Sequence, residues 1–278
     1  MNFRNSSLAD YLKCPAMYYW QWIRELDSNT LNIDLVFGGH IHNALECYFK
    51  SRKGGIISHL LALDKAIALF ISTFPADEFE VDKKSKIKNA TCAEIVLTGI
   101  TERYKDMLPE NIIEIETLYE RPIGNGHNFS GKIDLIVRER DRLICIDHKT
   151  SGRVSSSYSH KWNISRQFIG YCWLKEEQEF RVNFMHTVTK PNVDFPMYFY
   201  SQKQIHRWEQ STAFLCNTIA ELTNRLAPPN FSADMLFPRI GSHCEMYSCK
   251  FETLCHQDVE LENVIVPTML YKPYKSNY

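Results

Sequence analysis

The sequence lacks the features that would assign it to a membrane, secreted or repeat class. No run of apolar residues approaches the roughly eighteen needed to span a bilayer, and no repeat or low-complexity tract is visible. The first residues, MNFRNSSLADYLK, do not contain the apolar core of a signal peptide. We therefore expect a soluble, cytoplasmic protein.

The sequence also lacks a surplus of charge of either sign. Its 32 basic and 33 acidic residues leave a formal net charge of −1 at neutral pH. A generally basic surface is thereby excluded, so any contacts with nucleic-acid phosphates must come from local patches. The densest basic run contains Lys83, Lys84, Lys86 and Lys88, and both a solvated loop and a DNA contact remain open for it.

The nine cysteines are not expected to form disulfides, because no export signal accompanies them. Five of them lie inside apolar periodic segments, where free cysteine packs as a small core residue. These five are Cys47, Cys92, Cys145, Cys172 and Cys216. The other four lie in polar surroundings, where thiols suit an iron-sulfur cluster or a structural zinc ion. These four are Cys14, Cys244, Cys249 and Cys255.

The stretch from Gly131 to Thr150, GKIDLIVRERDRLICIDHKT, predicts a hairpin of two strands joined by a polar turn. Apolar and polar residues alternate in both halves, as in strands with two different faces. We expect Arg138 to pair with Leu143 across the turn. In that register Asp134 stands directly opposite Asp147, and the apolar residues fall together on the other face.

Two carboxylates in direct opposition indicate a metal site. Like charges so placed destabilise a sheet by up to about 1 kcal/mol, and a divalent cation that prefers oxygen ligands, such as Mg²⁺ or Mn²⁺, removes this repulsion. Lys149 lies two residues beyond Asp147 on the same face, where an ammonium could stabilise charge that develops on a phosphate. The alternative is an exposed strand edge on which Lys132 and Lys149 balance the two acids.

The hairpin closely resembles the active site of PD-(D/E)XK nucleases, specifically their RecB-like exonuclease group. The shared pattern is G-x-x-D, present as GKID, followed after twelve residues by D-x-K, present as DHK. The resemblance implies that Asp134 and Asp147 are metal ligands and that Lys149 is the catalytic lysine. It also implies that the backbone carbonyl of His148 contacts the metal, while its side chain points away.

Two further strings resemble motifs of the same group. FGGHIHNALECYF, expected on a helix, resembles the glycine-histidine motif, which implies that His42 reaches the metal. The alternative is an exposed helical pair of His42 with Glu46. QFIGY, on a helix after the hairpin, matches the QxxxY motif, which implies that Gln167 and Tyr171 orient the substrate and the site.

The second cysteine group resembles the iron-sulfur branch of these nucleases, which includes the AddB nuclease domain and the iron-sulfur nuclease of CRISPR adaptation. One N-terminal cysteine and a C-terminal C-x4-C-x5-C imply a 4Fe-4S cluster, although the branch commonly has two residues between its second and third cysteines. Structural Zn²⁺, with His243 and His256 beside the thiols, is the alternative. Either site would close a loop of about 230 residues, and a covalent crosslink of that size stabilises by about 4 to 5 kcal/mol.

Periodicity and capping residues predict the elements that carry these motifs. Helices are expected at 6–22, from 37 onward, and at 58–74, 90–107, 161–175 and 207–226, and strands at 112–123, 180–188 and 195–200. The strand at 112–123 carries Glu114, Glu116 and Glu120 on one face. One of these glutamates would assist the metal.

We predict a single α/β domain over residues 1–278, with the PD-(D/E)XK core of a mixed sheet flanked by helices. Residues 1–110 form a mainly helical part, 111–200 the catalytic core, and 201–278 a helix and the cysteine closure. The predicted activity is Mg²⁺- or Mn²⁺-dependent hydrolysis of DNA by an exonuclease that acts on single-stranded ends. The alternative is a non-catalytic DNA-binding or assembly subunit that works with a helicase or with an integration or recombination complex.

Overall fold

The computed structural model divides the chain into two compact units. It describes residues 1–278 except 56, 80–83, 85, 153–159, 227–230, 241–243, 245–248, 258 and 275–278, so that Lys83 and His243 lie outside the described residues. Unit 1 comprises Met1–Thr30, Glu120–Gly131 and His206–Tyr278, and unit 2 comprises Leu31–Tyr119 and Lys132–Ile205. The sequence predicted a single domain, and the division into two compact units does not test that prediction.

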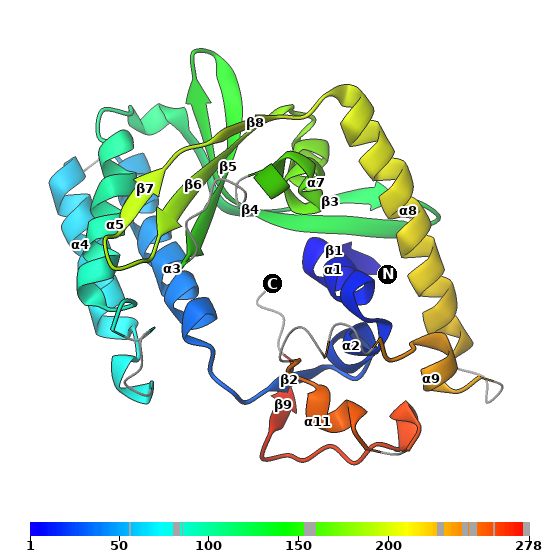
Figure 1. Ribbon diagram of the computed structural model, residues 1–278. Helices are drawn as coiled ribbons and strands as arrows, with labels where there is room; N and C mark the ends of the chain where they lie inside the picture. The colour runs from blue at the N-terminus through cyan, green and yellow to red at the C-terminus, as the bar shows by residue number, and fades with distance from the viewer. Residues whose placement is uncertain are drawn as a thin grey trace. The chain divides into compact units, whose positions relative to one another are not determined.

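A mixed sheet forms the centre of unit 2 (Figure 1). Its strands are β3 (Ile112–Ile123, in unit 2 to Tyr119), β4 (His127–Glu139, in unit 2 from Lys132), β5 (Arg142–Ser151), β6 (Glu179–His186), β7 (Asn192–Asp194) and β8 (Met197–Phe199). β4 and β5 form the predicted antiparallel hairpin, β5 and β6 run parallel, and β7 and β8 both pair antiparallel with β6. Because β3 pairs with β4, the hairpin is an interior part of the sheet.

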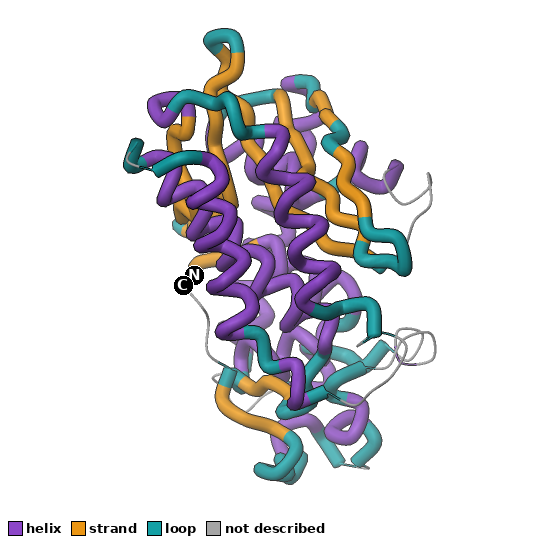
Figure 2. The backbone as a smooth tube through the Cα atoms, turned by 90° about the vertical axis from the view of Figure 1, so that its left-hand side faces the viewer, coloured by secondary structure: helices purple, strands orange, loops and turns teal. Residues whose placement is uncertain are grey.

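Helices cover both faces of this sheet, and Figure 2 shows the helical layer in front of the strands. One face carries α3 (Ile33–Lys53), α4 (His59–Thr73) and α5 (Ala90–Arg103), and the other carries α7 (Arg166–Lys175). The first three helices pack on strand residues Leu135, Val137, Ile144, Ile146 and Met185. On the other face, Phe168 of α7 stacks on Phe180 of β6 with ring centroids 4.5 Å apart. Four of the five predicted core cysteines are buried, and Cys47 is partly exposed.

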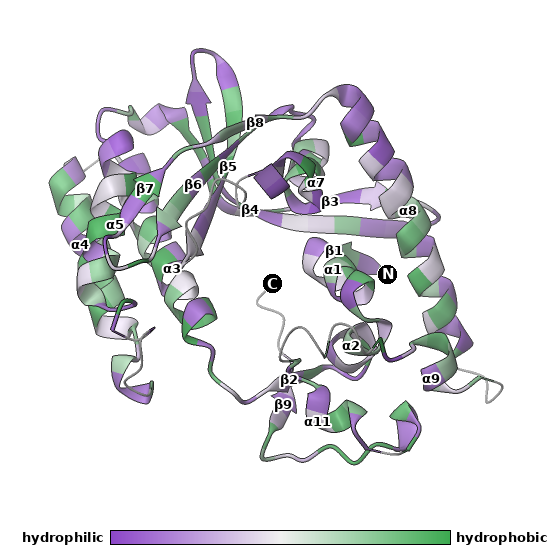
Figure 3. Cartoon of the chain, in the orientation of Figure 1, coloured by the Kyte–Doolittle hydropathy of each residue, from purple (hydrophilic) through white to green (hydrophobic). Residues whose placement is uncertain are grey.

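The helix α4 is rich in apolar residues (Figure 3). Within His59–Glu78, an 18-residue window has a mean hydropathy of 1.3, so one segment does reach the length and composition of a membrane span, contrary to the expectation from the sequence. Ala62 and Phe70 of this helix are buried in the core of unit 2, whereas Asp64 and Lys65 are exposed. Core helices of soluble proteins can have the same length and hydropathy, so a single such helix is weak evidence for a membrane span.

Unit 1 is built from short elements and one long helix. They are β1 (Asn2–Arg4), α1 (Asn5–Lys13), α2 (Pro15–Tyr18), a π-helical turn (Tyr19–Ile23), β2 (Leu26–Ser28), α8 (Gln202–Arg225, in unit 1 from His206), α9 (Ala233–Leu236), α11 (Glu252–Cys255) and β9 (Tyr271–Pro273). β1 runs parallel to the first part of β4, and β2 pairs antiparallel with β9. Aromatic contacts join distant segments, with Tyr18 stacked on Phe237 and Trp208 edge-on to Phe129.

The first helix is shorter than predicted. It begins at Asn5 and stops at Lys13, whereas the sequence pattern extended it to residue 22. Cys14 is extended, with φ −162° and ψ 116°, because the following Pro15 disfavours helical backbone at the residue before it. The chain then continues as α2, so Cys14 lies at a break between two helices.

The other predicted elements are present, some with shifted ends. The helix at 58–74 and the strand at 112–123 are confirmed as α4 and β3. α7 starts at Arg166 rather than at 161, because the side chain of Ser165 accepts the N–H of Phe168 and caps the helix there. The strand expected at 195–200 covers only Met197–Phe199.

Alanine at the two neighbouring glycines of α3 should have different effects. A Cβ at Gly38 would lie 3.1 Å from Oγ1 of Thr150 on β5, whereas a Cβ at Gly39 would meet nothing within 4 Å. Because glycine inside a helix costs about 0.5 to 1 kcal/mol relative to alanine, Gly39→Ala should raise the thermal unfolding temperature. Gly38→Ala should gain less or lower it, and Thr150→Ala in that background should recover the gain. Equal unfolding temperatures for the two single variants would show that the close approach does not constrain α3.

Candidate metal centre

The acidic residues of the hairpin meet where its hydrogen-bond ladder ends. The register is confirmed, but the ladder stops at the pair Leu135 and Ile146. Asp134 therefore does not face Asp147 as an ordinary strand pair. Its Oδ2 instead accepts the backbone N–H of His148 at 2.7 Å. The carboxylate thus accepts an N–H that a backbone carbonyl would accept in a continued ladder, and this hydrogen bond fixes Asp134 to β5.

Both carboxylates are buried. Asp134 is 7% exposed and Asp147 is 2% exposed, so the alternative of a solvated hairpin edge is wrong. Burial raises the pKa of each carboxyl to about 6, and the Lys149 ammonium opposes that rise at both. Two ionised carboxylates at this depth need a positive partner, because an uncompensated buried charge is strongly destabilising.

The helix α3 brings His42 to the end of the hairpin. Nε2 of His42 lies 2.8 Å from the backbone oxygen of His148, and because a carbonyl only accepts, Nε2 carries the proton. Nδ1 then presents its lone pair 3.4 Å from Oδ2 of Asp134 and 3.9 Å from Oε1 of Glu116. Burial lowers the pKa of His42, which favours this neutral ring. The His148 carbonyl, predicted to contact the metal, is thus bonded to His42.

Glu116 is the glutamate of β3 that reaches the site. Its backbone is left-handed, with φ 50°, in the middle of a strand. For a residue with a side chain this conformation costs roughly 1 to 3 kcal/mol, and such strain is found mainly at functional sites. Oε1 faces His42, while Nζ of Lys132 lies 2.6 Å from Oε2. The pair with Lys132 fixes the carboxylate and leaves one oxygen toward the imidazole.

The other glutamates that the sequence offered for this site make contacts elsewhere. Glu114 lies 3.7 Å from Nζ of Lys175 of α7. Glu120 accepts a hydrogen bond from Asn128 at 2.6 Å within unit 1. Glu46, the alternative partner of His42, pairs at 2.6 Å with the lysine four residues further along α3. None of the three therefore competes with Glu116 for the site.

Three side chains from three elements could share one cation. Ligand atoms of His42, Glu116 and Asp134 all lie within 4.8 Å of one another, and no other trio of His, Cys, Asp and Glu does so in the part of the chain that the structure describes. A set with two carboxylates and one imidazole suits Mg²⁺ or Mn²⁺, which prefer hard oxygen ligands. The donor set therefore fits the metal that the sequence predicted.

Asp147 adjoins this trio and is held from two sides. Nζ of Lys149 lies 2.7 Å from its Oδ2, and Nε2 of Gln167 donates to its Oδ1 at 3.3 Å. Gln167 also donates to the hydroxyl of Tyr171, one turn further along α7, at 2.9 Å. The structure therefore brings all the predicted residues of the nuclease site into unit 2. They are His42, Asp134, Asp147, His148, Lys149, Gln167 and Tyr171.

Lys132 is the site residue that the sequence reasoning missed. We interpreted it only as a counter-charge on an exposed edge, whereas it binds Glu116 inside the site. Its place two residues before Asp134 was the available signal, because residues two apart share a face of a strand. His148 behaves as expected, with its ring buried and stacked on Phe49 at an interplanar angle of 7°.

The four cysteines of the second group gather in unit 1. Burial, together with the neighbouring Cys244, Cys255 and Cys14, raises the pKa of Cys249 to about 11. The backbone N–H of Ile240 donates to Sγ of Cys14 at 3.5 Å, and all nine cysteines are free thiols. In the part of the chain that the structure describes, no three of these four sulfurs lie within 4.8 Å of one another.

The raised pKa values indicate that Asp134→Asn should stabilise the metal-free protein. Asp134 and Asp147 bind protons more tightly in the folded chain, with pKa about 6, than at their usual value of 3.8. The free energy of unfolding therefore decreases as the pH rises from about 4 to about 6. Asparagine keeps an oxygen for the N–H of His148 but carries no charge. With a chelator at about pH 7.5, the variant should be more stable by about 1 to 3 kcal/mol in chemical denaturation, and by little near pH 4.

Asp64→Asn, at an exposed position on α4, is the matched control and should change stability little at either pH. Added Mn²⁺ should stabilise the wild type near neutral pH and have less effect on Asp134→Asn, because one ligand is lost. A variant that is less stable than the wild type at both pH values would contradict a destabilising burial of this carboxylate.

Comparison with a protein-family model assigns the chain to a family. The chain matches the PD-(D/E)XK nuclease superfamily over residues 5–256, and no curated protein matches it. A protein from Eubacterium rectale, described provisionally as an exonuclease, shares the fold, with a TM-score of 0.53 and 13% identity over 92% of this chain and 88% of that chain. The crystal structure of SSO0001 gives a TM-score of 0.33 and 19% identity over 52% of this chain and 61% of its own. Because the family match spans most of the sequence, the chain belongs to the PD-(D/E)XK nuclease superfamily.

Proposed function

We propose that the protein is a metal-dependent deoxyribonuclease that acts as an exonuclease on single-stranded DNA ends. The proposal rests chiefly on the trio of His42, Glu116 and Asp134, of which Asp134 is buried and the other two are partly buried, and beside which Lys149 contacts Asp147. His42, Asp134 and Asp147 would hold Mg²⁺ or Mn²⁺, with Glu116 as the assisting carboxylate. The bound cation would supply a nucleophilic water at neutral pH and neutralise charge on the phosphate.

The chain's own residues orient the ligands and the substrate. The hydrogen bond from Nε2 of His42 to the carbonyl of His148 fixes the ring, so that its other nitrogen faces the carboxylates. Lys149 would stabilise the charge that develops on the phosphate, since its ammonium is already held at the site by Asp147. Gln167 holds the second oxygen of Asp147 from α7 and so limits rotation of that carboxylate.

The choice of DNA ends as substrate has two supports. The Eubacterium rectale protein of similar fold is described provisionally as an exonuclease. The net charge of −1 is small, which fits recognition of a strand at a local site better than coating of a long duplex.

A second candidate is a non-catalytic DNA-binding or assembly subunit, whose partners would be a helicase or an integration or recombination complex. Burial raises the pKa of both carboxyls to about 6, so they destabilise the folded protein at neutral pH without serving a purely structural subunit. The ordered contacts of Lys149 and Gln167 with Asp147 likewise favour catalysis.

Asp134→Ala and Asp147→Ala should each reduce Mn²⁺-dependent cleavage of single-stranded DNA by about 100-fold or more, because each removes a predicted ligand. Lys149→Ala should reduce turnover while Mn²⁺ binding, measured by titration, persists. Cleavage of 5′- and 3′-labelled linear strands gives the polarity, and circular single strands test the need for an end. Asp64→Ala on the exposed face of α4 is the control and should cut like the wild type.

Wild-type rates for both Asp134→Ala and Asp147→Ala would refute the assignment of the site. Equal cutting of circular and linear strands would refute the exonuclease mode while leaving the nuclease intact.

We further propose that unit 1 carries a 4Fe-4S cluster, with structural Zn²⁺ as the alternative, on Cys14, Cys244, Cys249 and Cys255. The four thiols come from both ends of the chain and lie in unit 1, where Cys244, Cys255 and Cys14 are near enough to Cys249 to raise its pKa. Burial raises the pKa of Cys255, and the indole of Trp20 and the guanidinium of Arg239 oppose that rise. Such a group would tie the first and last segments of unit 1 together.

Anaerobically purified protein should be brown and contain about four irons per chain if the cluster is present. Cys14→Ala should bleach the colour and lower the thermal unfolding temperature, because the staple of unit 1 is lost. Cys92→Ala, at a buried thiol in the core of unit 2, is the control and should keep the colour. A colourless preparation with stoichiometric zinc would exclude the cluster without bearing on the nuclease site.

A further inference from the structure

A cavity with charged side chains in its lining lies at the carboxyl ends of the parallel strands β5 and β6. It has a volume of about 670 Å³ and is lined by Asp34 at the start of α3, by Lys84, Ile87 and Lys88, and by the ends of the two strands. Such a volume is in the usual range for ligand pockets, and the carboxyl ends of parallel strands are frequent ligand sites. The polar side chains that matter here are Asp34, Lys84, Lys88, Ser151, Lys161 and Thr187.

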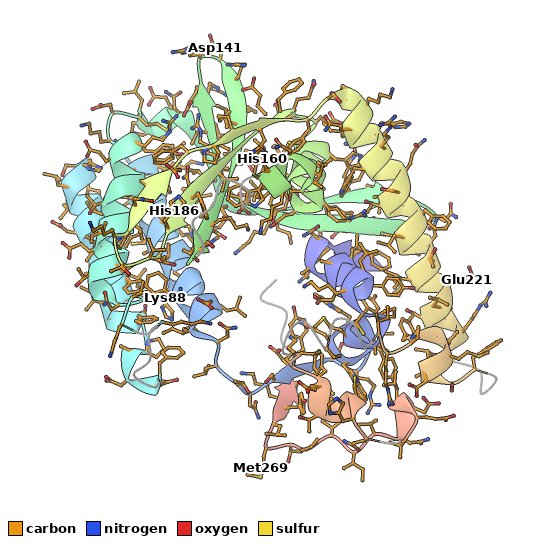
Figure 4. All side chains as sticks on the ribbon, in the orientation of Figure 1. Lys88, Asp141, His160, His186, Glu221 and Met269 are labelled. Atoms are coloured by element: carbon orange, nitrogen blue, oxygen red, sulfur yellow. The ribbon has the colours of Figure 1, made fainter. Side chains whose placement is uncertain are left out.

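The lining carries more positive than negative charge. Three lysines face one carboxylate, which leaves a surplus of two positive charges at neutral pH. Lys88 (labelled in Figure 4) is only 5% exposed, and its Nζ lies 2.7 Å from Oδ1 of Asp34. Nζ of Lys84 lies 3.1 Å from Oδ2 of the same residue. The basic run that we left open between a solvated loop and a DNA contact therefore places a buried ammonium in this cavity.

Thr187 gives an indication of a ligand that does not depend on charge. It is 1% exposed and lines the cavity, and its Oγ1 has no hydrogen-bond partner among the residues that the structure describes. Its backbone N–H donates to the carbonyl of Ser151 at 2.8 Å, which fixes the position of the residue. A buried hydroxyl without a partner costs about 1 to 3 kcal/mol, so an acceptor that enters the cavity would be favoured.

We propose that the cavity is a phosphate-binding subsite, in which the lysines supply positive charge and the hydroxyl of Thr187 donates a hydrogen bond. The ionised oxygens of a phosphate accept hydrogen bonds and carry the negative charge that the lining lacks. Asp34, on the first turn of α3, occupies Lys84 and Lys88 until a phosphate displaces it.

The position of the cavity at the end of β5 indicates where the phosphate would come from. Ser151 follows Lys149 by two residues on an extended strand, a distance of about 7 Å. A DNA strand whose cleaved phosphate lies at the metal centre would therefore present a phosphate one or two positions away near this cavity. That source rests on the proposed nuclease function, and a released mononucleotide would offer the same group.

The test is the binding of inorganic phosphate to metal-free protein in a chelator, where no turnover occurs. Phosphate should raise the unfolding temperature of the wild type above that in chloride of equal ionic strength. Lys88→Met should weaken binding by about tenfold or more, and Thr187→Val by about threefold to tenfold. Thr187→Val removes only a hydroxyl and keeps the shape, so it decides the question if Lys88→Met does not fold. Lys65→Met, at an exposed position of α4, should bind as the wild type does.

Competition then identifies the source of the phosphate. Displacement of inorganic phosphate by single-stranded oligonucleotides assigns the substrate strand, and displacement by a mononucleotide alone assigns the released product. The proposal is overturned if phosphate has no effect beyond that of chloride, or if Thr187→Val binds phosphate as tightly as the wild type and the Lys65→Met control do. Phosphate binding in a protein that cuts no DNA would overturn the proposed function instead, so the two failures are distinguishable.

Discussion

The metal centre depends on the backbone of one residue, His148. Its N–H binds the carboxylate of Asp134, and its carbonyl binds the ring of His42, so side chains from β4 and α3 are positioned by the same peptide segment. The imidazole of His148 anchors this segment, because it is buried, stacked on Phe49 and hydrogen-bonded to Asn183. A shift of β5 by one residue would move both contacts at once.

The hairpin and its motifs could be predicted because their signals are local. Alternation assigned Asp134 and Asp147 to one face, and the polar turn fixed the register that the structure confirms. Gln167 and Tyr171 lie four residues apart on a helix, and they bond to each other for that reason. The break of the first helix at Cys14 could also have been predicted, because proline follows this residue.

The rest could not be predicted, because it depends on segments far apart in the chain. Asp134 and Asp147 look like edge residues in isolation and are buried because helices cover both faces of their sheet. Glu116 was one of three equivalent candidates, and its left-handed backbone and its ion pair with Lys132 separate it from the others. Lys88 belongs to a run that is solvated in most proteins, and its burial follows from Asp34 on another element.

The left-handed backbone at Glu116 sets stability against activity at a single position. Glycine there would relieve the strain, and any uncharged residue would remove a buried carboxylate. Selection for heat resistance alone would favour such a replacement, whereas selection for turnover would keep the glutamate. In a laboratory population screened only for thermal survival, Glu116 on β3 should therefore be replaced before either aspartate of the hairpin is lost.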